Sequence, residues 1–159
     1  MTPGKQFEND IKNSIPKDKN YFFYRFRDNA ANFGSGNSNT RFSSNNLCDC
    51  LIMAKDKLFF VELKTHKGAS LPLSAIRKNQ LDGMAKINHP NIRAVFIINF
   101  RDKNKTYSIA AEELKNYFDN NDRKSITIGY LEEHGTEIIA KKKITHYRYD
   151  LENYFEKER

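Results

Sequence analysis

The sequence predicts an α/β domain in which helices cover both faces of a central mixed β-sheet. Three observations carry this prediction. Helix-like and strand-like patterns alternate along the chain, which is typical of α/β layers. Two short apolar runs, 47–53 and 58–64, flank a polar tetrad as the arms of a hairpin do. The segment 92–100 is almost continuously apolar, as expected of a strand buried on both faces.

The length of 159 residues is that of one ordinary domain with its own core. We expect a single domain over 1–159. Its core spans about 4–110, and the elements in 111–159 follow weaker patterns.

The first elements are a helix, a strand and a long loop. Phe7, Ile11 and Ile15 recur at helical spacing, and Pro16 ends the helix. The aromatic run 21–26 predicts a strand. Residues 28–46 are rich in Asn, Ser and Gly, which predicts a long loop between that strand and the hairpin.

Beyond the hairpin, apolar residues at helical spacing predict a helix over 73–88, followed by the buried strand. The remaining predictions are a turn at 101–105, a short strand at 106–109, a helix at 111–118, strands at 125–130 and within 137–145, and a helix at 150–158.

The hairpin register brings two acids together. If Ala54 to Lys57 form the turn, opposed residues have numbers that sum to 111, so Asp49 lies across from Glu62 with Cβ atoms about 4.5–5.5 Å apart. Side chains alternate along a strand, so Lys64 shares the face of Glu62. Opposed carboxylates repel and lose solvation, and a divalent cation removes that cost. The spacing predicts a metal site beside a lysine; the alternative is a surface Glu62–Lys64 ion pair with Asp49 capping the loop.

Two further polar residues have candidate positions at this site. Gln80 lies four residues from both Ile76 and Met84, within the apolar stripe of the predicted helix, where a metal ligand or a metal-bound water would satisfy its amide. The alternative is a Gln at the edge of the stripe that reaches solvent. Glu8 flanks the stripe of the first helix and either turns inward as a further carboxylate or pairs with Lys12.

Composition limits the class of protein and its environment. The net charge of +7 points to a polyanionic partner, although it also fits simple solubility. The N-terminus lacks the apolar core of a signal peptide, and no apolar stretch is long enough to span a bilayer, so we expect a cytoplasmic protein without membrane partners. Cys48 and Cys50 are predicted to be small buried residues rather than a disulfide or a zinc site.

Taken together, the motifs resemble a known family. The acid followed by acid-x-lysine is the signature of the restriction-endonuclease-like superfamily, and within it the chain resembles the RecU-type Holliday-junction resolvases of Gram-positive bacteria and their phages. The resemblance covers about 4–110. The matching pieces are Lys5, Phe7 and Glu8; the run 24–28; Phe42 through Cys48 and Asp49; the run 61–65; the run 71–73; and Asn79 with Gln80.

The resemblance implies a restriction-endonuclease-like fold and a site for Mg²⁺ or Mn²⁺. Asp49, Glu62 and Gln80 would organise the metal. Lys64 would stabilise the attacking water or the developing charge, and Glu8 would complete the catalytic set with Asp49, Glu62 and Lys64. This chain departs from the family in having Leu47 where a hydroxyl residue is frequent, and in a short, Gly- and Asn-rich segment before Asp49.

Basic residues that surround the motif in sequence are candidates for contacts with phosphates, although each also fits an ordinary solvated position. They are Arg25, Arg27, Arg41, Lys67, Arg77 and Lys78. The four histidines have no ligand spacing and are expected to be structural or surface residues.

The leading hypothesis is therefore a homodimeric, Mg²⁺-dependent endonuclease that cuts four-way DNA junctions by paired symmetric incisions. A restriction-like or repair nuclease with another DNA substrate is an alternative. A DNA-binding recombination factor without catalysis is the other, and the two opposed carboxylates argue against it.

Overall fold

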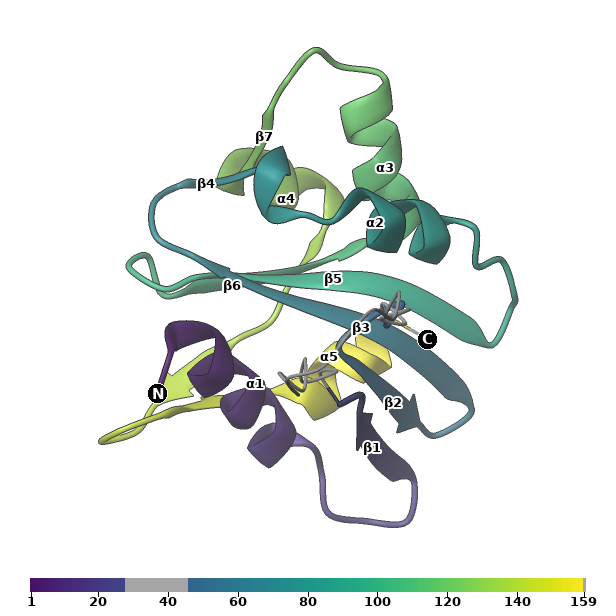
Figure 1. Cartoon of the computed structure of the whole chain (residues 1–159). Coiled ribbons are helices and arrows are strands. Elements are labelled where there is room, and N and C mark those ends of the chain that lie inside the picture. The colour runs from purple at the N-terminus through teal and green to yellow at the C-terminus, as the bar shows by residue number, and fades with distance from the viewer. Residues whose placement is uncertain (28–45, 159) are drawn as a thin grey trace, which may run out of the picture.

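The computed structural model describes residues 1–27 and 46–158, and Arg41 lies outside this part of the chain. A mixed sheet forms the centre of the molecule (Figure 1). Its strands lie in the order β1 (Tyr21–Arg25), β2 (Cys50–Ala54), β3 (Lys57–His66), β5 (Ile92–Phe100), β6 (Lys105–Ala110) and β8 (Thr136–Glu137). β3 and β5 are parallel, and the other neighbouring strands are antiparallel.

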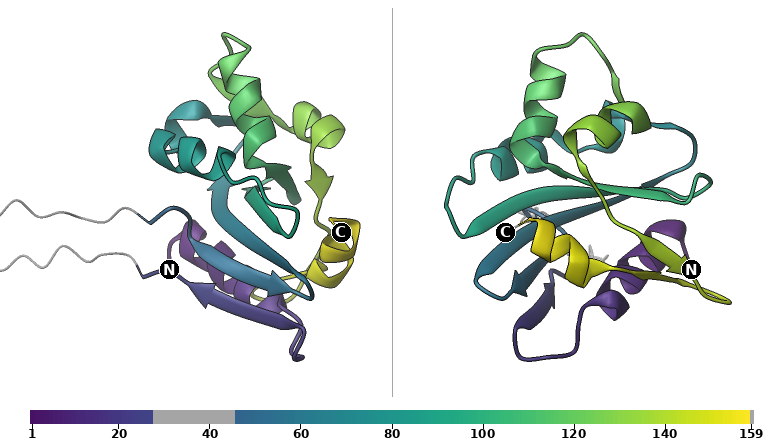
Figure 2. Two further views of the ribbon diagram at one scale, coloured as in Figure 1. Left: turned by 90° about the vertical axis from the view of Figure 1, so that its right-hand side faces the viewer. Right: turned by 180° about the vertical axis from the view of Figure 1, so that it is seen from behind.

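Helices cover both faces of this sheet, as the sequence predicts. On one face lie α1 (Pro3–Ser14) and α5 (Leu151–Lys157). On the other lie α2 (Lys78–Ala85), α3 (Ala111–Asp119) and α4 (Ile128–His134). The two further views in Figure 2 show the same division into layers.

The central strand β5 explains why the molecule has two cores. Val95 and Ile97 pack into the cluster under α1 and α5, whereas Phe96 and Ile98 pack into the cluster under α2, α3 and α4. Because side chains alternate along a strand, a strand covered on both faces must be apolar at consecutive positions. The prediction of a buried strand over 92–100 is confirmed to the residue.

Helix α1 begins and ends where its sequence directs. The Thr2 side chain accepts a hydrogen bond from the Lys5 amide, and Pro3 occupies the first turn. Phe7 and Ile11 bury the inner side. Ile15 is extended because the residue before Pro16 is driven away from helical geometry, so the predicted stop is confirmed.

The predicted helix over 73–88 is wrong in its extent. Leu73–Ala75 form a 3₁₀ turn, Ile76 and Arg77 are extended, and α2 begins only at Lys78. The cause is a long-range contact: the amide of Leu73 donates to the carbonyl of Lys124 at 2.7 Å. This bond continues the pairing of β4 (Ser70–Pro72) with β7 (Ser125–Thr127) and holds the segment away from the helical path.

The C-terminal strand predictions are partly wrong. The strand expected at 125–130 stops at Thr127, whose side chain accepts a hydrogen bond from the Tyr130 amide at 3.2 Å and begins α4. The strand expected within 137–145 is divided between β8 and β9 (Ala140–Lys142), and β9 pairs with β10 (Tyr147–Tyr149) in a separate hairpin. The helices predicted at 111–118 and 150–158 are confirmed as α3 and α5.

Both cysteines are buried and free, in agreement with the prediction from their spacing. Across residues 1–27 and 46–158, no helix combines the length and the apolar character that crossing a membrane requires.

Candidate active site

The β2–β3 hairpin has the predicted register. Cys50 pairs with Val61 and Ala54 with Lys57, so opposed numbers sum to 111. The turn is tighter than expected, because Ala54 and Lys57 already belong to the ladder. Only Lys55 and Asp56 form the turn, and Lys55 adopts a left-handed φ of 57° to close it.

Asp49 lies one residue before β2, where the ladder is no longer regular. Its amide donates to the carbonyl of Val61 at 3.1 Å, and its Oδ2 accepts a hydrogen bond from the Leu63 amide at 2.8 Å. The carboxylate therefore takes the place of a backbone carbonyl on the β3 edge. Asp49 reaches the neighbourhood of Glu62 through this bond rather than through the plain cross-strand opposition that the register predicts.

Glu62 is the buried centre of the site, with 2% of its surface exposed. Its Oε1 lies 2.8 Å from the Lys64 ammonium nitrogen, and its Oε2 accepts a hydrogen bond from Nε2 of Gln80 at 3.1 Å. Burial, followed by the negative charge of Asp49, raises the pKa of Glu62 to about 7, although Lys64 and Arg77 oppose the shift. Burial thus disfavours the ionised form of Glu62 despite the ion pair with Lys64.

Gln80 faces the interior from α2, 4% exposed. Its Nε2 donates to Glu62 and, at 3.4 Å, to the carbonyl of Asn46. Its Oε1 is buried and has no hydrogen-bond partner within the described residues. Leaving a buried amide oxygen unpaired costs about 1–3 kcal/mol, so this atom is placed to accept a ligand that the protein itself does not provide.

These oxygen atoms fit a hard divalent cation. The carboxylates of Asp49 and Glu62 and the amide oxygen of Gln80 are the donor types that Mg²⁺ and Mn²⁺ prefer. Nowhere in 1–27 and 46–158 do three or more His, Cys, Asp or Glu side chains gather as a metal cluster. A cation here would have two carboxylates, and its other ligands would be neutral oxygens, water or phosphate.

Glu8 has an ion-pair partner that its sequence position does not suggest. Its Oε2 lies 2.7 Å from Nε of Arg25 on β1, and among the ion pairs of the described residues Glu8 is joined to Arg25 rather than to Lys12. Glu8 is nonetheless near the start of β2, because its charge adds to burial, Cys48 and Asp49 in raising the pKa of the Cys50 thiol. It borders the site through an ion pair that crosses from α1 to β1.

The basic candidates are dispersed. Arg77 is exposed, yet its charge acts on Glu62, so it borders the site. Lys78 is held by Asp82 at 2.6 Å on α2. Arg27 and Lys67 are exposed, Arg25 pairs with Glu8, and Arg41 lies outside the described residues.

The site also uses backbone groups that the sequence does not single out. The carbonyl of Asn46 accepts from Gln80, and the amide of Leu63 holds Asp49. Every residue has a backbone carbonyl and every residue but proline a backbone N–H, so only the three-dimensional path of the chain reveals which of these groups the site uses. The position of Asn46 at the end of a Gly-, Ser- and Asn-rich run is the sole sequence signal near them.

The fold and the site together define a class. A mixed sheet is flanked by helices, and an acidic pair, a lysine and a glutamine meet at one place, contributed by the residue before β2, by β3 and by α2. This is the restriction-endonuclease-like architecture. The family is equally clear. The chain belongs to the RecU (Recombination protein U) family, whose sequence profile matches residues 4–151. This match continues well past 110 into the C-terminal elements.

Individual relatives agree with this assignment. The chain is 34% identical over 164 residues to the SPbeta prophage-derived uncharacterized protein YotM of Bacillus subtilis strain 168, covering 93% of this chain and 82% of that protein. The fold of this chain is similar to the solved structure of Hjc, a Holliday junction resolvase of Archaeoglobus fulgidus. The TM-score is 0.53, and the two are 13% identical over 84% of this chain and 95% of Hjc. Family and fold support a nuclease of the Holliday-junction-resolvase class.

Proposed function

We propose that this chain is a metal-dependent endodeoxyribonuclease that resolves four-way DNA junctions by paired, symmetric hydrolysis of phosphodiesters. One observation carries the catalytic part of the proposal. The buried Glu62 lies between the Lys64 ammonium and the Gln80 amide, next to Asp49, and an unpaired amide oxygen remains at the same place.

Asp49, Glu62 and Gln80 hold the metal in this proposal, as Mg²⁺ or Mn²⁺. A bound divalent cation supplies charge neutralisation at the phosphate and lowers the pKa of water. The protein fixes the ligands in advance: the Leu63 amide orients Asp49, and the Gln80 amide orients Glu62. Such supporting contacts keep ligand geometry constant and raise affinity.

Lys64 serves the reaction as a fixed positive charge. Its ammonium group is 2.8 Å from Glu62 with its side chain 19% exposed, so it can also meet a scissile phosphate at the surface. Negative charge develops on the phosphate oxygens during attack, and a preorganised cation there lowers the barrier. We assign Lys64 to charge stabilisation and water orientation rather than to proton abstraction.

Glu8 and Arg25 act together at the border of the site. The carboxylate holds the guanidinium on the exposed side of β1, where it is available to a phosphate of the bound DNA. Arg27, Arg41, Lys67, Arg77 and Lys78 are proposed to add backbone contacts of the same kind. The protein would act in the cytoplasm. It would act as a homodimer, because two symmetric nicks in one junction require two active sites related by a dyad.

The decisive experiment offers labelled four-way junction, linear duplex and single strand to the protein with Mg²⁺, beside the Asp49→Asn variant. We expect symmetric incision of the junction only, and we expect the variant to abolish it. Preferential cutting of plain duplex would replace the resolvase with a restriction-like or repair nuclease. Binding without any cutting, with Mn²⁺ as well as Mg²⁺, would leave a non-catalytic recombination factor and defeat the proposal.

A further inference from the structure

The hairpin of β9 and β10, residues 140–149, is a basic arm that the catalytic site does not use. It carries Lys141, Lys142, Lys143 and Arg148 within eight residues, and no acid occurs between 140 and 149. The amide of Lys143 donates to the carbonyl of His146 at 2.7 Å and closes the tip. The hairpin extends past the N-terminal end of α1, at lower left in Figure 1 and at right in the second view of Figure 2.

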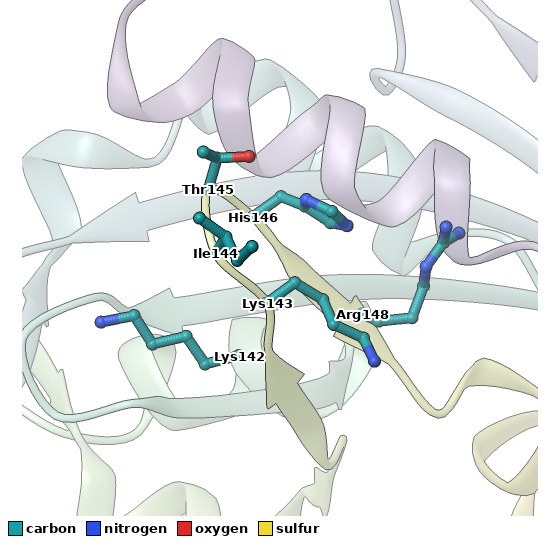
Figure 3. A pocket seen from close by; sticks show the side chains of 6 residues that line it. All are labelled: Lys142, Lys143, Ile144, Thr145, His146 and Arg148. Carbon is teal, nitrogen blue, oxygen red and sulfur yellow. The ribbon is translucent and has the colours of Figure 1, made fainter.

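The register divides the hairpin into an inner and an outer face. Tyr149 and Ala140 are opposed and pack into the core under α1 and α5, and Tyr147 packs against the same cluster. Lys141 and Arg148 are opposed on the other face, and alternation adds Lys143 and His146 to them. Figure 3 shows Lys143 and Arg148 extending to one side of the hairpin, with Lys142 on the other.

Helix α1 fixes the base of this hairpin. The amide of Tyr147 donates to Oδ2 of the buried Asp10 at 3.0 Å, and the amide of Tyr149 donates to Oγ of Ser14 at 2.9 Å. Oδ1 of Asp10 is taken by Gln6. Side chains of α1 thus satisfy the free edge of β10 as a further strand would, so the outer face is held in a fixed position on the body.

The positive charge of the outer face is uncompensated. Lys141, Lys143 and Arg148 are exposed, and none of them forms an ion pair anywhere in 1–27 and 46–158. By contrast, Lys105 and Lys115 are paired with acids. Lys141 and Arg148 are directly opposed across the two strands, where like charges repel each other. A row of phosphates would convert this repulsion into attraction.

The shape of the tip agrees with a DNA ligand. Ile144 is 99% exposed at the end of the hairpin, beside a shallow hollow lined by Lys142, Lys143, Thr145, His146 and Arg148. An antiparallel two-stranded ribbon is narrow enough to follow a groove of duplex DNA, and basic residues on its face reach the backbone on either side.

We propose that the outer face of the β9–β10 hairpin binds the phosphate backbone of a DNA duplex arm, as a contact separate from the metal site. The identity of the ligand rests on the proposed function, whereas the location rests on the unpaired cations and the fixed hairpin. Contacts of this kind add affinity without reading sequence, and each displaces condensed counterions.

The test compares two charge-matched double variants by junction binding in Ca²⁺ or EDTA, where cleavage does not interfere. Lys141→Gln with Arg148→Gln removes the opposed pair of the hairpin. Arg123→Gln with Lys124→Gln removes the same total charge from an exposed loop outside the hairpin. We expect the hairpin variant to bind roughly tenfold more weakly and to lower the slope of log K against log [salt] by about 2, since each phosphate contact contributes about 0.9.

The control variant should retain the affinity and slope of the unaltered protein, and both variants should keep its melting temperature. Equal losses in the two variants would mean that only net charge matters and would overturn the proposal. The proposal would also be overturned if the hairpin variant bound DNA as well as the unaltered protein but no longer bound phosphatidylglycerol vesicles. That result would indicate that the hairpin binds a membrane surface. Failure of the proposed function is seen separately, as absence of junction cleavage by the unaltered protein with Mg²⁺.

Discussion

The side-chain nitrogen of Gln80 lies 3.1 Å from Oε2 of Glu62, so α2 delivers an amide to a carboxylate buried on β3. This contact occupies the donor of the amide and leaves its acceptor, Oε1, buried without a partner in the described residues. An arrangement that only stabilised the fold would satisfy both ends of the amide. The half-satisfied amide is what the site needs if a cation or its water completes it.

Gln80→Ala should therefore weaken metal binding. We expect the Mg²⁺ concentration for half-maximal cleavage to rise at least tenfold, because contacts that orient metal ligands contribute factors of about 10–100. The rise in melting temperature on adding Mg²⁺ should shrink in parallel, which gives a reading independent of activity. Gln80→Glu restores an oxygen donor and should recover Mg²⁺ binding.

Asn79→Ala is the matched control, because Asn79 precedes Gln80 on α2 and is exposed. It should leave both measurements unchanged. If Gln80→Ala had the Mg²⁺ dependence of the unaltered protein, Gln80 would be a core residue and the metal would have other ligands.

Lys64→Ala should separate cleavage from binding. Removing a preorganised charge from a reacting centre costs about 10²–10³ in rate, so we expect a loss of that size in single-turnover junction cleavage at saturating Mg²⁺. The dissociation constant for the junction should change only a few-fold. Lys57→Ala, on the same strand but bonded to the Pro90 carbonyl, should cleave normally. A Lys64→Ala variant that cuts at full rate would show that the ammonium has only a structural role.

Short-range geometry explains what the sequence could reveal about this site. The hairpin register followed from alternation and a tight turn, so the shared face of Glu62 and Lys64 could be foreseen. Asp49 was expected beside them, but it reaches Glu62 through the Leu63 amide rather than through direct opposition. Gln80 was also placed correctly, but partly for a wrong reason. Met84 lies in the same helix, whereas Ile76 is extended and precedes it.

Contacts between distant segments explain what the sequence could not reveal. The start of α2 depends on the bond from Leu73 to Lys124, which joins residues 51 positions apart. The direction of Glu8 depends on Arg25, 17 positions away on β1. Local patterns contain no information on either pairing, so helix periodicity predicted too long a helix and did not reveal the Glu8–Arg25 pair.

The Glu8–Arg25 pair predicts linked effects on DNA binding. If Glu8 acts by positioning Arg25, then Glu8→Gln and Arg25→Gln should each weaken junction binding about threefold to fivefold, and the double variant should be no weaker than Arg25→Gln alone. The pair is partly exposed, with side chains 24% and 39% accessible, so its coupling in stability should stay below about 1 kcal/mol.

The cleavage rate of the bound complex distinguishes this positioning role from a direct catalytic role of Glu8. Single-turnover cleavage at saturating protein should be near normal in Glu8→Gln. A large fall in that rate with unchanged binding would instead make Glu8 a further carboxylate of the reacting centre.

The pKa of Glu62 predicts how stability depends on pH. Burial and Asp49 raise this pKa from 4.5 to about 7, so the folded protein favours the protonated carboxyl. The contribution of Glu62 to the free energy of unfolding is therefore fully present below about pH 4.5 and is lost as pH rises through about 7. With about 1.4 kcal/mol for each unit, the loss is at most on the order of 3 kcal/mol.

Glu62→Gln isolates this contribution, since the two proteins share all their other side chains, whose contributions cancel in the comparison. In EDTA, the free energy of unfolding of the unaltered protein should fall relative to that of the variant between about pH 5 and pH 8. Mg²⁺ binds the ionised carboxylate, so it should restore stability more at pH 8 than at pH 5. Parallel pH profiles for the two proteins would mean that Glu62 is already ionised at low pH, with Lys64 alone sufficient to balance its charge.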